Sequence, residues 1–254
     1  MSRRVYFSNF LSIALILCLV WSTFTQAGDK PKTLDTDPNL AGWWKLDETS
    51  GIIAADSSKH NRKGFLREGL SFEKDSTSGR ISKALKFGRG DGYIKITKYK
   101  GVTGTRPRTV AAWCKTTETR GEIISWGIDD FGKMFTFCFI RGRVGIKPNG
   151  GYLYINEKTN DDQWHHLAAV VEEAELPNLH DDVKLYLDGE PAEIHDIGLL
   201  DLWPIDTGSE LDVTIGDGFK GTIDDVRIYD RPLSEDEINA IFKLQSNKPL
   251  QKSK

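Results

Sequence analysis

Short apolar segments that alternate with turn-forming residues run through this chain from about residue 40 to residue 229. Two neighbouring segments, 164–171 and 183–187, are rich in β-branched and aromatic residues, and Asp188-Gly189 follows the second one. An Asp-Gly pair is typical of the tight turns that join antiparallel strands. Many short strands separated by such turns are the signature of an all-β sandwich or barrel. The pattern therefore predicts an all-β fold of antiparallel strands.

A single helix is predicted, close to the C-terminus. Ser234, followed three residues later by Glu237, has the spacing of a capping box, which marks a helix start. Ile238 and Phe242 are four residues apart and therefore share one face of the helix. We expect this short helix to pack on the strands and to end before a polar tail over residues 245–254.

The N-terminus has the features of a secretory signal peptide. Arg3 and Arg4 precede an apolar run over residues 10–21, and small residues flank Gln26 at the end of the segment. Basic, apolar and small-residue parts in this order predict cleavage after Ala27. The apolar run is shorter than the roughly 20 residues that a membrane span needs. An uncleaved N-terminal anchor is the alternative that this pattern leaves open.

The remaining chain is interpreted as one exported domain. We expect a flexible polar leader over residues 28–39, a single domain over residues 40–244, and the polar tail. The mature chain contains no second apolar run long enough to span a membrane, so we expect a secreted, periplasmic or cell-envelope protein. The formal net charge of the chain is −3 and no basic stripe is present, which argues against a nucleic-acid partner.

Two cysteines, Cys114 and Cys138, remain after removal of the signal peptide. An even pair in an exported protein is compatible with one disulfide bond. Both residues lie in apolar, strand-like segments, where a free cysteine behaves as a small buried hydrophobe. The sequence leaves both alternatives open.

Several motifs, in order along the chain, resemble the laminin-G-like and concanavalin-A-like jelly-roll domains of bacterial exported proteins. The resemblance covers residues 40–244 and is carried by Trp44-Lys45-Leu46-Asp47-Glu48, Asp56-Ser57-Ser58, Ala84-Leu85-Lys86-Phe87, Thr109-Val110-Ala111-Ala112-Trp113, Trp164-His165-His166-Leu167 and Gly221-Thr222-Ile223-Asp224-Asp225-Val226-Arg227-Ile228-Tyr229. It implies an all-β, two-sheet antiparallel jelly-roll sandwich with one short C-terminal helix. It also implies a binding surface on a concave sheet or a loop rim, and often a structural Ca²⁺ ion.

Acidic residues in turns are the candidate Ca²⁺ ligands, because Ca²⁺ takes six to eight oxygen ligands. In jelly rolls of this kind the first and last strands are neighbours. We therefore expect an ion between the two ends of the domain, with ligands drawn from Asp47, Glu48, Asp56, Asp224 and Asp225. Alternative ligands sit in Gly-rich turns at Asp91, Asp129, Asp130 and Asp217. All of these residues also suit turns in which the side chain bonds its own backbone.

Aromatic residues in or near loops are the candidates for ligand binding. Sugar rings stack on exposed aromatic faces while polar groups bind their edges. The candidates are Trp126, Phe131, Tyr152, Tyr154 and Trp203. Burial in the core is the alternative for each of them.

The sequence favours binding over catalysis. A glycoside hydrolase needs two carboxylates that flank one cleft. Glu173 and Glu175 are two residues apart, but they lie in an acidic loop next to Pro177, where we expect them to be solvated. We therefore predict a non-catalytic module that binds a glycan or an extracellular protein. The expected Ca²⁺ ion would make this binding dependent on Ca²⁺. A glycoside hydrolase of the same fold and a structural envelope protein are the alternatives.

Overall fold

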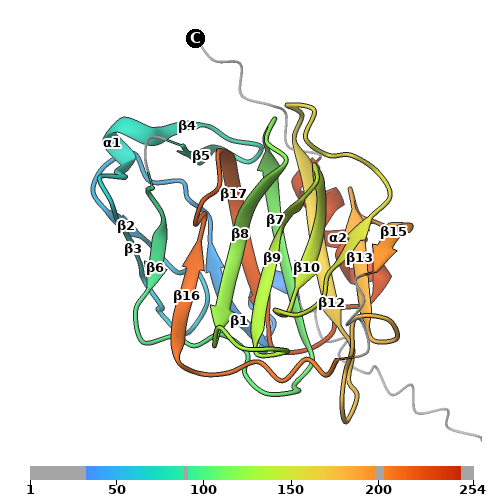
Figure 1. Cartoon of the computed structure of the whole chain (residues 1–254). Coiled ribbons are helices and arrows are strands. Elements are labelled where there is room, and N and C mark those ends of the chain that lie inside the picture. The colour runs from blue at the N-terminus through green and yellow to red at the C-terminus, as the bar shows by residue number, and fades with distance from the viewer. Residues whose placement is uncertain (1–32, 89–90, 198–202, 247–254) are drawn as a thin grey trace, which may run out of the picture. The chain divides into compact units, whose positions relative to one another are not determined.

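The computed structural model describes residues 33–88, 91–197 and 203–246, which form two antiparallel sheets packed face to face (Figure 1). The predicted signal peptide lies outside these residues. Sheet A contains β1 (Leu40–Trp44), β4 (Ser76–Ser78), β5 (Lys83–Phe87), β7 (Arg108–Lys115), β12 (His165–Val171), β13 (Val183–Leu187), β14 (Glu190–Pro191) and β17 (Gly221–Tyr229). Sheet B contains β2 (Ile53–Ala54), β3 (Gly64–Leu66), β6 (Ile94–Ile96), β8 (Arg120–Gly127), β9 (Met134–Ile140), β10 (Arg143–Lys147), β11 (Leu153–Ile155), β15 (Ile194–Ile197) and β16 (Leu211–Ile215).

The strand order confirms the two-sheet jelly-roll sandwich that the sequence predicted. Sheet A runs β14-β13-β12-β7-β17-β5-β4, and β1 also pairs with β17. Sheet B runs β15-β11-β10-β9-β8-β16-β6-β3-β2. The first and last strands, β1 and β17, are therefore neighbours, as expected. The helical segments of the described residues are η1 (Leu34–Thr36), α1 (Phe72–Asp75) and α2 (Glu235–Ser246), and none of them is long and apolar enough to cross a membrane.

The predicted hairpin between β12 and β13 is present, with Leu167 opposite Leu187 and Val171 opposite Val183. The turn that follows joins β13 to β14. Its two central residues, Asp188 and Gly189, have φ angles of 51° and 86°. Two consecutive residues with positive φ are characteristic of the turn type that matches the natural twist of paired strands. The Asp-Gly pair therefore ends β13 at a defined position.

The main core lies between the two sheets and is built by alternation along the strands. In β1, Trp44 points between the sheets, whereas its neighbour Trp43 points to the outer face of sheet A. Trp44 is fully buried and its indole N–H donates to the carbonyl of Arg62 at 2.9 Å. Strands β1, β7, β12, β13 and β17 of sheet A thus contribute to two apolar layers, one inside the sandwich and one on its outer face.

Helix α2 covers part of the outer face of sheet A, as Figure 1 shows behind β12 and β13. Its start has the predicted capping box. The Ser234 hydroxyl accepts from the Glu237 amide at 3.3 Å, and the Glu237 carboxylate accepts from the Ser234 amide at 2.9 Å. Ile238 and Ile241 pack against Trp43 and other residues on this outer face. The helix therefore closes a second, smaller core.

The packed part of the chain begins before residue 40, where the sequence analysis placed the start of the domain. Asp35 in η1 pairs with Arg227 at 2.6 Å, and Asp37 pairs with Arg231 at 2.5 Å. Leu34 packs against the outer core of sheet A. Ion pairs to Arg227 in β17 and to Arg231, two residues beyond that strand, thus hold the polar segment over residues 33–39. The polarity of the segment alone did not predict this packing.

Cys114 and Cys138 are both free and buried. Cys114 points from β7 of sheet A into the main core, whereas Cys138 lies on β9 of sheet B, outside that core. Of the two alternatives that the sequence left open, the structure therefore has two buried free thiols and not the disulfide. Burial raises the pKa of Cys138 to about 12, so this thiol stays protonated at neutral pH.

Thiol titration tests this assignment. We expect Ellman's reagent to react with neither thiol in the folded protein and with both after denaturation, because a buried, protonated thiol is inert. Melting in the presence and absence of dithiothreitol should give the same midpoint. A midpoint that falls on reduction would contradict the assignment.

His166 is a buried titratable group under α2. It is 1% exposed and its ring lies 5.4 Å from that of Trp113 and 6.1 Å from that of Phe242. Burial lowers the pKa of His166 to about 4. An unfolded histidine has a pKa of about 6.5, so on acidification the unfolded state takes up a proton before the folded state does. His166 therefore destabilises the fold progressively as the pH falls from about 6.5 to about 4.

We predict that His166→Leu makes the free energy of unfolding less dependent on pH in this range. The full difference is on the order of 3 kcal/mol, because each pKa unit corresponds to about 1.4 kcal/mol. Urea unfolding at several pH values for both proteins measures it. The two proteins must be compared with each other, because other groups also change the stability of each with pH. The buried carboxyl of Asp224, whose pKa is raised, stabilises the fold as the pH falls and so opposes the effect of His166. If the free energy of unfolding depended on pH equally in the two proteins, the prediction would be wrong.

Candidate binding site

Two of the predicted aromatic residues, Phe131 and Trp203, meet on the loop rim of the sandwich. Phe131 is 54% exposed and Trp203 is 47% exposed, and their ring centroids are 6.0 Å apart. Both line one hollow of about 530 Å³, here called the rim site. Its lining residues are Thr105, Asp130, Phe131, Lys133, Leu176, Trp203, Pro204 and Asp206. Apolar faces edged by charged groups are the arrangement expected for a sugar-binding surface.

Backbone hydrogen bonds hold the loops of the rim site together. The Asp206 amide donates to the Gly132 carbonyl at 2.9 Å, and the Ile205 amide donates to the Pro177 carbonyl at 2.7 Å. The site is thus assembled from the β6–β7, β8–β9 and β12–β13 loops and from the segment that begins at residue 203. Leu176, which is 62% exposed, is a member that the sequence analysis missed.

Two glycines leave room for the aromatic pair. Gly132 has a φ of 72°, and a Cβ atom there would lie 2.6 Å from the indole of Trp203. Gly150 has a φ of 102°, and a Cβ atom there would lie 2.2 Å from the ring of Phe131. Both positions therefore require glycine, because of backbone conformation and because of the close approach of a ring. These glycines separate strands in the sequence, which gave no indication that they face aromatic residues.

The other predicted aromatic residues do not lie in the rim site. Trp126 is buried in the main core, where it stacks on Phe135 at 4.4 Å, so its assignment to ligand binding was wrong. Tyr154 is also fully buried, and its hydroxyl accepts from Arg141 at 3.0 Å, which excludes its ring from a sugar surface. Tyr152 is half-buried and stacks on Tyr154 at 5.7 Å. These three residues differ from Phe131 and Trp203 in how far they are buried, and their position in or near loops in the sequence did not reveal this difference.

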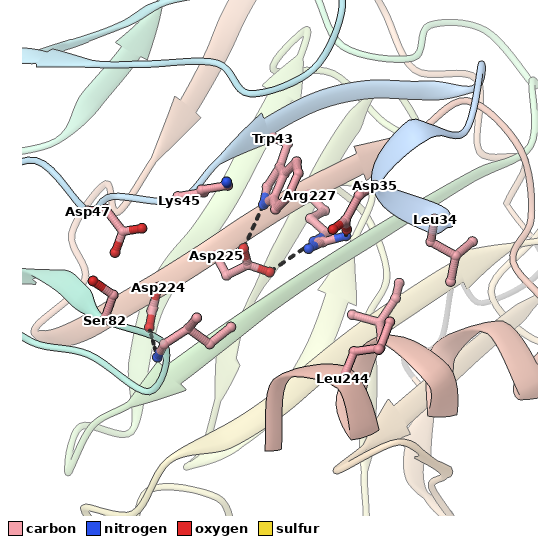
Figure 2. A pocket seen from close by; sticks show the side chains of 12 residues that line it. Leu34, Asp35, Trp43, Lys45, Asp47, Ser82, Asp224, Asp225, Arg227 and Leu244 are labelled. Atoms are coloured by element: carbon pink, nitrogen blue, oxygen red, sulfur yellow. Dashed lines mark hydrogen bonds and ion pairs between the residues drawn. The ribbon is translucent and has the colours of Figure 1, made fainter. Parts of the chain in front are cut away.

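A second hollow, of about 340 Å³, lies on the outer face of sheet A between β1, β17 and α2 (Figure 2). It contains three of the acidic residues predicted to bind Ca²⁺, which are Asp47, Asp224 and Asp225. Strand β17 has a bulge at this point, where the register with β7 shifts between Asp224 and Arg227. The bulge turns two consecutive aspartates to the same face. A regular strand would have placed one of them inside the core.

Asp225 is part of a buried ion-pair network, not of an open ligand set. One of its oxygens accepts from the indole N–H of Trp43 at 2.6 Å and the other from Arg227 at 2.9 Å, as Figure 2 shows. Arg227 is 4% exposed and also pairs with Asp35. Burial disfavours the charged guanidinium, but Asp225 and the other groups around it raise the pKa of Arg227, so it stays charged. The network joins η1, β1 and β17.

Asp224 and Asp47 face the same hollow with different surroundings. One Asp224 oxygen accepts from the Ile81 amide at 2.8 Å, and the other is buried without a partner in the described structure. Burial raises the pKa of Asp224 well above its usual range, and the carboxylates of Asp225 and Asp47 add to the effect. Asp47 accepts from the Lys83 amide at 2.9 Å. A protonated carboxyl must lose its proton before it can bind a metal ion.

The remaining predicted Ca²⁺ ligands lie elsewhere. Asp56 accepts four hydrogen bonds, from the amides of Trp43, Ser58 and Arg62 and from the Ser58 hydroxyl. Glu48 accepts from the Ala55 amide at 2.7 Å. Within residues 33–88, 91–197 and 203–246, no group of three or more His, Cys, Asp or Glu residues could hold a metal ion. Among the described residues the predicted positions thus hold no cluster of three such ligands, and Ca²⁺ binding stays a prediction from the sequence.

Removal of the Asp225 charge tests the network. We expect Asp225→Asn to lower the free energy of unfolding by about 3–5 kcal/mol, because it leaves the buried Arg227 guanidinium without its buried carboxylate partner. Glu172→Gln is the matched control, since Glu172 pairs at 2.8 Å with Lys184 and both side chains are substantially exposed. That exposed pair should contribute at most about 1 kcal/mol. Equal effects of the two substitutions in chemical denaturation would contradict the assignment.

Comparison with known proteins identifies relatives at the level of the family and the fold. Residues 88–239, more than half of the chain, match the family described as the concanavalin A-like lectin/glucanases superfamily. No curated protein sequence matches the chain. Domain 4 of AbnA, an extracellular GH43 arabinanase from Geobacillus stearothermophilus solved in complex with arabinotriose, is similar with a TM-score of 0.59 and 18% identity. The alignment covers 80% of this chain and 98% of that domain.

Toxin binding domains share the same fold. The binding domain of Paraclostridial Mosquitocidal Protein 1 has a TM-score of 0.57 and 15% identity, over 82% of this chain and 53% of the other. The receptor binding domain of botulinum neurotoxin D has a TM-score of 0.52 and 13% identity, over 82% and 53%. This chain thus spans about half of each toxin domain. At these identities the likeness establishes the jelly-roll fold alone.

Proposed function

Because the chain belongs to the concanavalin A-like lectin/glucanase superfamily, we propose that it is an exported, non-catalytic module that binds carbohydrate at the rim site. The observation that carries the proposal is the exposed Phe131–Trp203 pair, with charged residues at its edge. Exposed aromatic faces are costly to leave in water and mark binding surfaces. Export rests on the predicted signal peptide, which directs the chain outside the cell or into its envelope.

The carboxylates of the rim site and of the β12–β13 loop favour binding over hydrolysis at this rim. Glu173 and Glu175 are exposed in the β12–β13 loop. Asp130 and Asp206 line the rim site, and both are exposed as well. A glycosidase keeps its acid protonated at neutral pH by placing it in an apolar, desolvated position. None of these four side chains has such an environment.

The ligand class follows from the shape and chemistry of the rim site. Two rings about 6.0 Å apart and an adjoining Leu176 give an apolar surface that suits the flat faces of sugar rings. Arabinotriose, bound by a domain of the same fold, is a suitable first probe, together with other neutral oligosaccharides. An extracellular protein that covers the same apolar residues is the alternative partner.

The proposal is tested by a glycan-array screen followed by calorimetry on the sugars that bind. We expect Trp203→Ala and Phe131→Ala each to weaken binding by about tenfold or more, because truncation of a central aromatic residue typically costs about 2 kcal/mol. Ile52→Ala serves as the control. Ile52 lies just before β2, outside the rim site, and its apolar side chain is about as exposed as those of Phe131 and Trp203.

Two further arms complete the test. Assays with Ca²⁺ and with EDTA measure whether binding needs the ion, which stays a prediction from the sequence. An assay for released reducing ends measures hydrolysis, and turnover would overturn the non-catalytic assignment. Unchanged affinity of both aromatic variants for a bound sugar would place the binding site elsewhere, and the absence of any glycan ligand would overturn carbohydrate binding.

A further inference from the structure

A third hollow, of about 550 Å³, has a polar lining and shares no lining residue with the rim site or with the hollow beside α2. Three lysines line it, which are Lys86, Lys115 and Lys220, and here it is called the lysine hollow. Threonine and serine residues and the indole ring of Trp164 line it as well. The hollow therefore offers cations, hydroxyl groups and an aromatic ring to one ligand.

The lysine hollow lies on the outer face of sheet A, where β5, β17 and β7 are neighbours (Figure 1). Side chains alternate between the two faces of a strand. Lys86, Thr222 and Lys115 each stand next to residues that point into the main core, and these core residues are Leu85, Phe87, Ile223 and Cys114. Lys86, Thr222 and Lys115 therefore point the opposite way, out of the sandwich.

Strand pairing brings the three lysines together around Thr222. Thr222 lies opposite Lys86 of β5 on one side and opposite Lys115 of β7 on the other. Neighbouring strands are about 5 Å apart, so the backbones of these two lysines are about 10 Å apart. Lys220 precedes Thr222 by two residues, and a Cβ atom on Gly88, at the end of β5, would lie 3.4 Å from its Cβ and Cγ atoms. The three cations are thus within reach of one extended ligand.

The positive charge of the lysine hollow is only partly compensated. Lys86 and Lys220 are exposed, and neither forms an ion pair or a side-chain hydrogen bond with a residue that the structure describes. Lys115 pairs at 3.7 Å with Asp162, which is 61% exposed, and such an exposed pair is weak. Glu118 is a second exposed carboxylate in the lining. Three lysines against two carboxylates leave a net positive charge, in a chain whose formal net charge is −3.

Trp164 and Thr222 give the hollow groups that bind a sugar. Because His165 lies opposite Cys114, Trp164 lies beside Lys115 at the next position of the same register. Trp164 is half-buried, so part of its ring is open to a ligand. A sugar ring stacks on an indole, while its hydroxyl groups bond to side chains such as that of Thr222, which can both donate and accept.

We propose that the lysine hollow is a second binding site, which takes an acidic polysaccharide laid across β5, β17 and β7. Carboxylate or sulfate groups on successive sugars pair with the three lysines, and one sugar ring packs on Trp164. An exposed ion pair is weak by itself, so the affinity comes from several contacts along one chain. The saccharide part of this inference rests on the proposed carbohydrate-binding function, whereas the preference for negative charge rests on the hollow alone.

The experiment compares chains that differ in charge. Calorimetry at low salt measures the binding of oligogalacturonates and of their methyl esters, of dextran sulfate and dextran, and of poly(dT) as a nucleic-acid arm. We expect a charged saccharide to bind at least about tenfold more tightly than its neutral counterpart, and added salt to reduce this advantage. Affinity should also rise with the length of the oligogalacturonate, because only a longer chain reaches all three lysines. The pair that shows the preference identifies the carboxylate or the sulfate as the ligand.

Paired variants then locate the site. Lys86→Gln with Lys220→Gln should abolish the preference for the charged saccharide, because both lysines lie in the hollow. Lys63→Gln with Lys147→Gln is the matched control and should leave the preference unchanged. These two lysines are also exposed, but Lys63 lies just before β3 and Lys147 closes β10, so both belong to sheet B. The two double variants change the net charge by the same amount.

Asp162→Asn tests the site in the opposite direction. It removes the carboxylate that competes with the ligand for Lys115. We expect this variant to bind the charged saccharide several-fold more tightly and its neutral counterpart as before, since an exposed ion pair of this kind is worth at most about a factor of five. Weaker binding of the charged saccharide would contradict the proposed role of Lys115.

Three results would overturn the proposal. These are equal binding of charged and neutral saccharides, a charge preference that survives Lys86→Gln with Lys220→Gln, and tighter binding of poly(dT) than of any saccharide. The two proposals fail separately, because Trp203→Ala should weaken neutral sugars at the rim site without removing the charge preference. Absence of neutral-sugar binding would overturn the rim site, and absence of the charge preference would overturn the lysine hollow.

Discussion

Strand β17 is the element on which the rest of the structure depends. One of its edges pairs with β7, and its other edge pairs first with β5 and then with β1. Its inward residues, including Ile223 and Ile228, belong to the main core between the sheets. Its outward residues meet η1 and the hollow beside α2. Because both ends of the domain and both apolar layers meet on this strand, disruption of it would disconnect them.

The bulge in β17 explains why this strand carries an ionic network. Bulges place an extra residue on one strand and are retained where a side chain must be redirected. Here the bulge turns Asp225 towards Trp43 and Arg227. A buried carboxylate and guanidinium are costly to desolvate and are tolerated only when they are fully paired. The network therefore specifies how the N-terminal segment docks on the sandwich more than it adds to stability.

The rim site is built from loops that the sandwich holds in place. Its aromatic rings approach the backbone at Gly132 and Gly150, where a side chain would collide with them. Proteins often place binding residues on such loops, because a rigid scaffold positions them while their sequence is free to vary.

The sequence by itself determined the fold class, the β12–β13 hairpin, the Asp188-Gly189 turn and the capped helix at Ser234. All of these depend on residues close together in the chain, whose periodicity and turn chemistry are readable directly. It also identified Phe131 and Trp203 as candidates. Only the tertiary structure decided that these two meet while Trp126 and Tyr154 are buried, since burial depends on strands far apart in sequence. For the same reason, only the three-dimensional structure placed Cys114 and Cys138 on different sheets. It alone also revealed the hydrogen bonds that occupy Asp56 and Asp225.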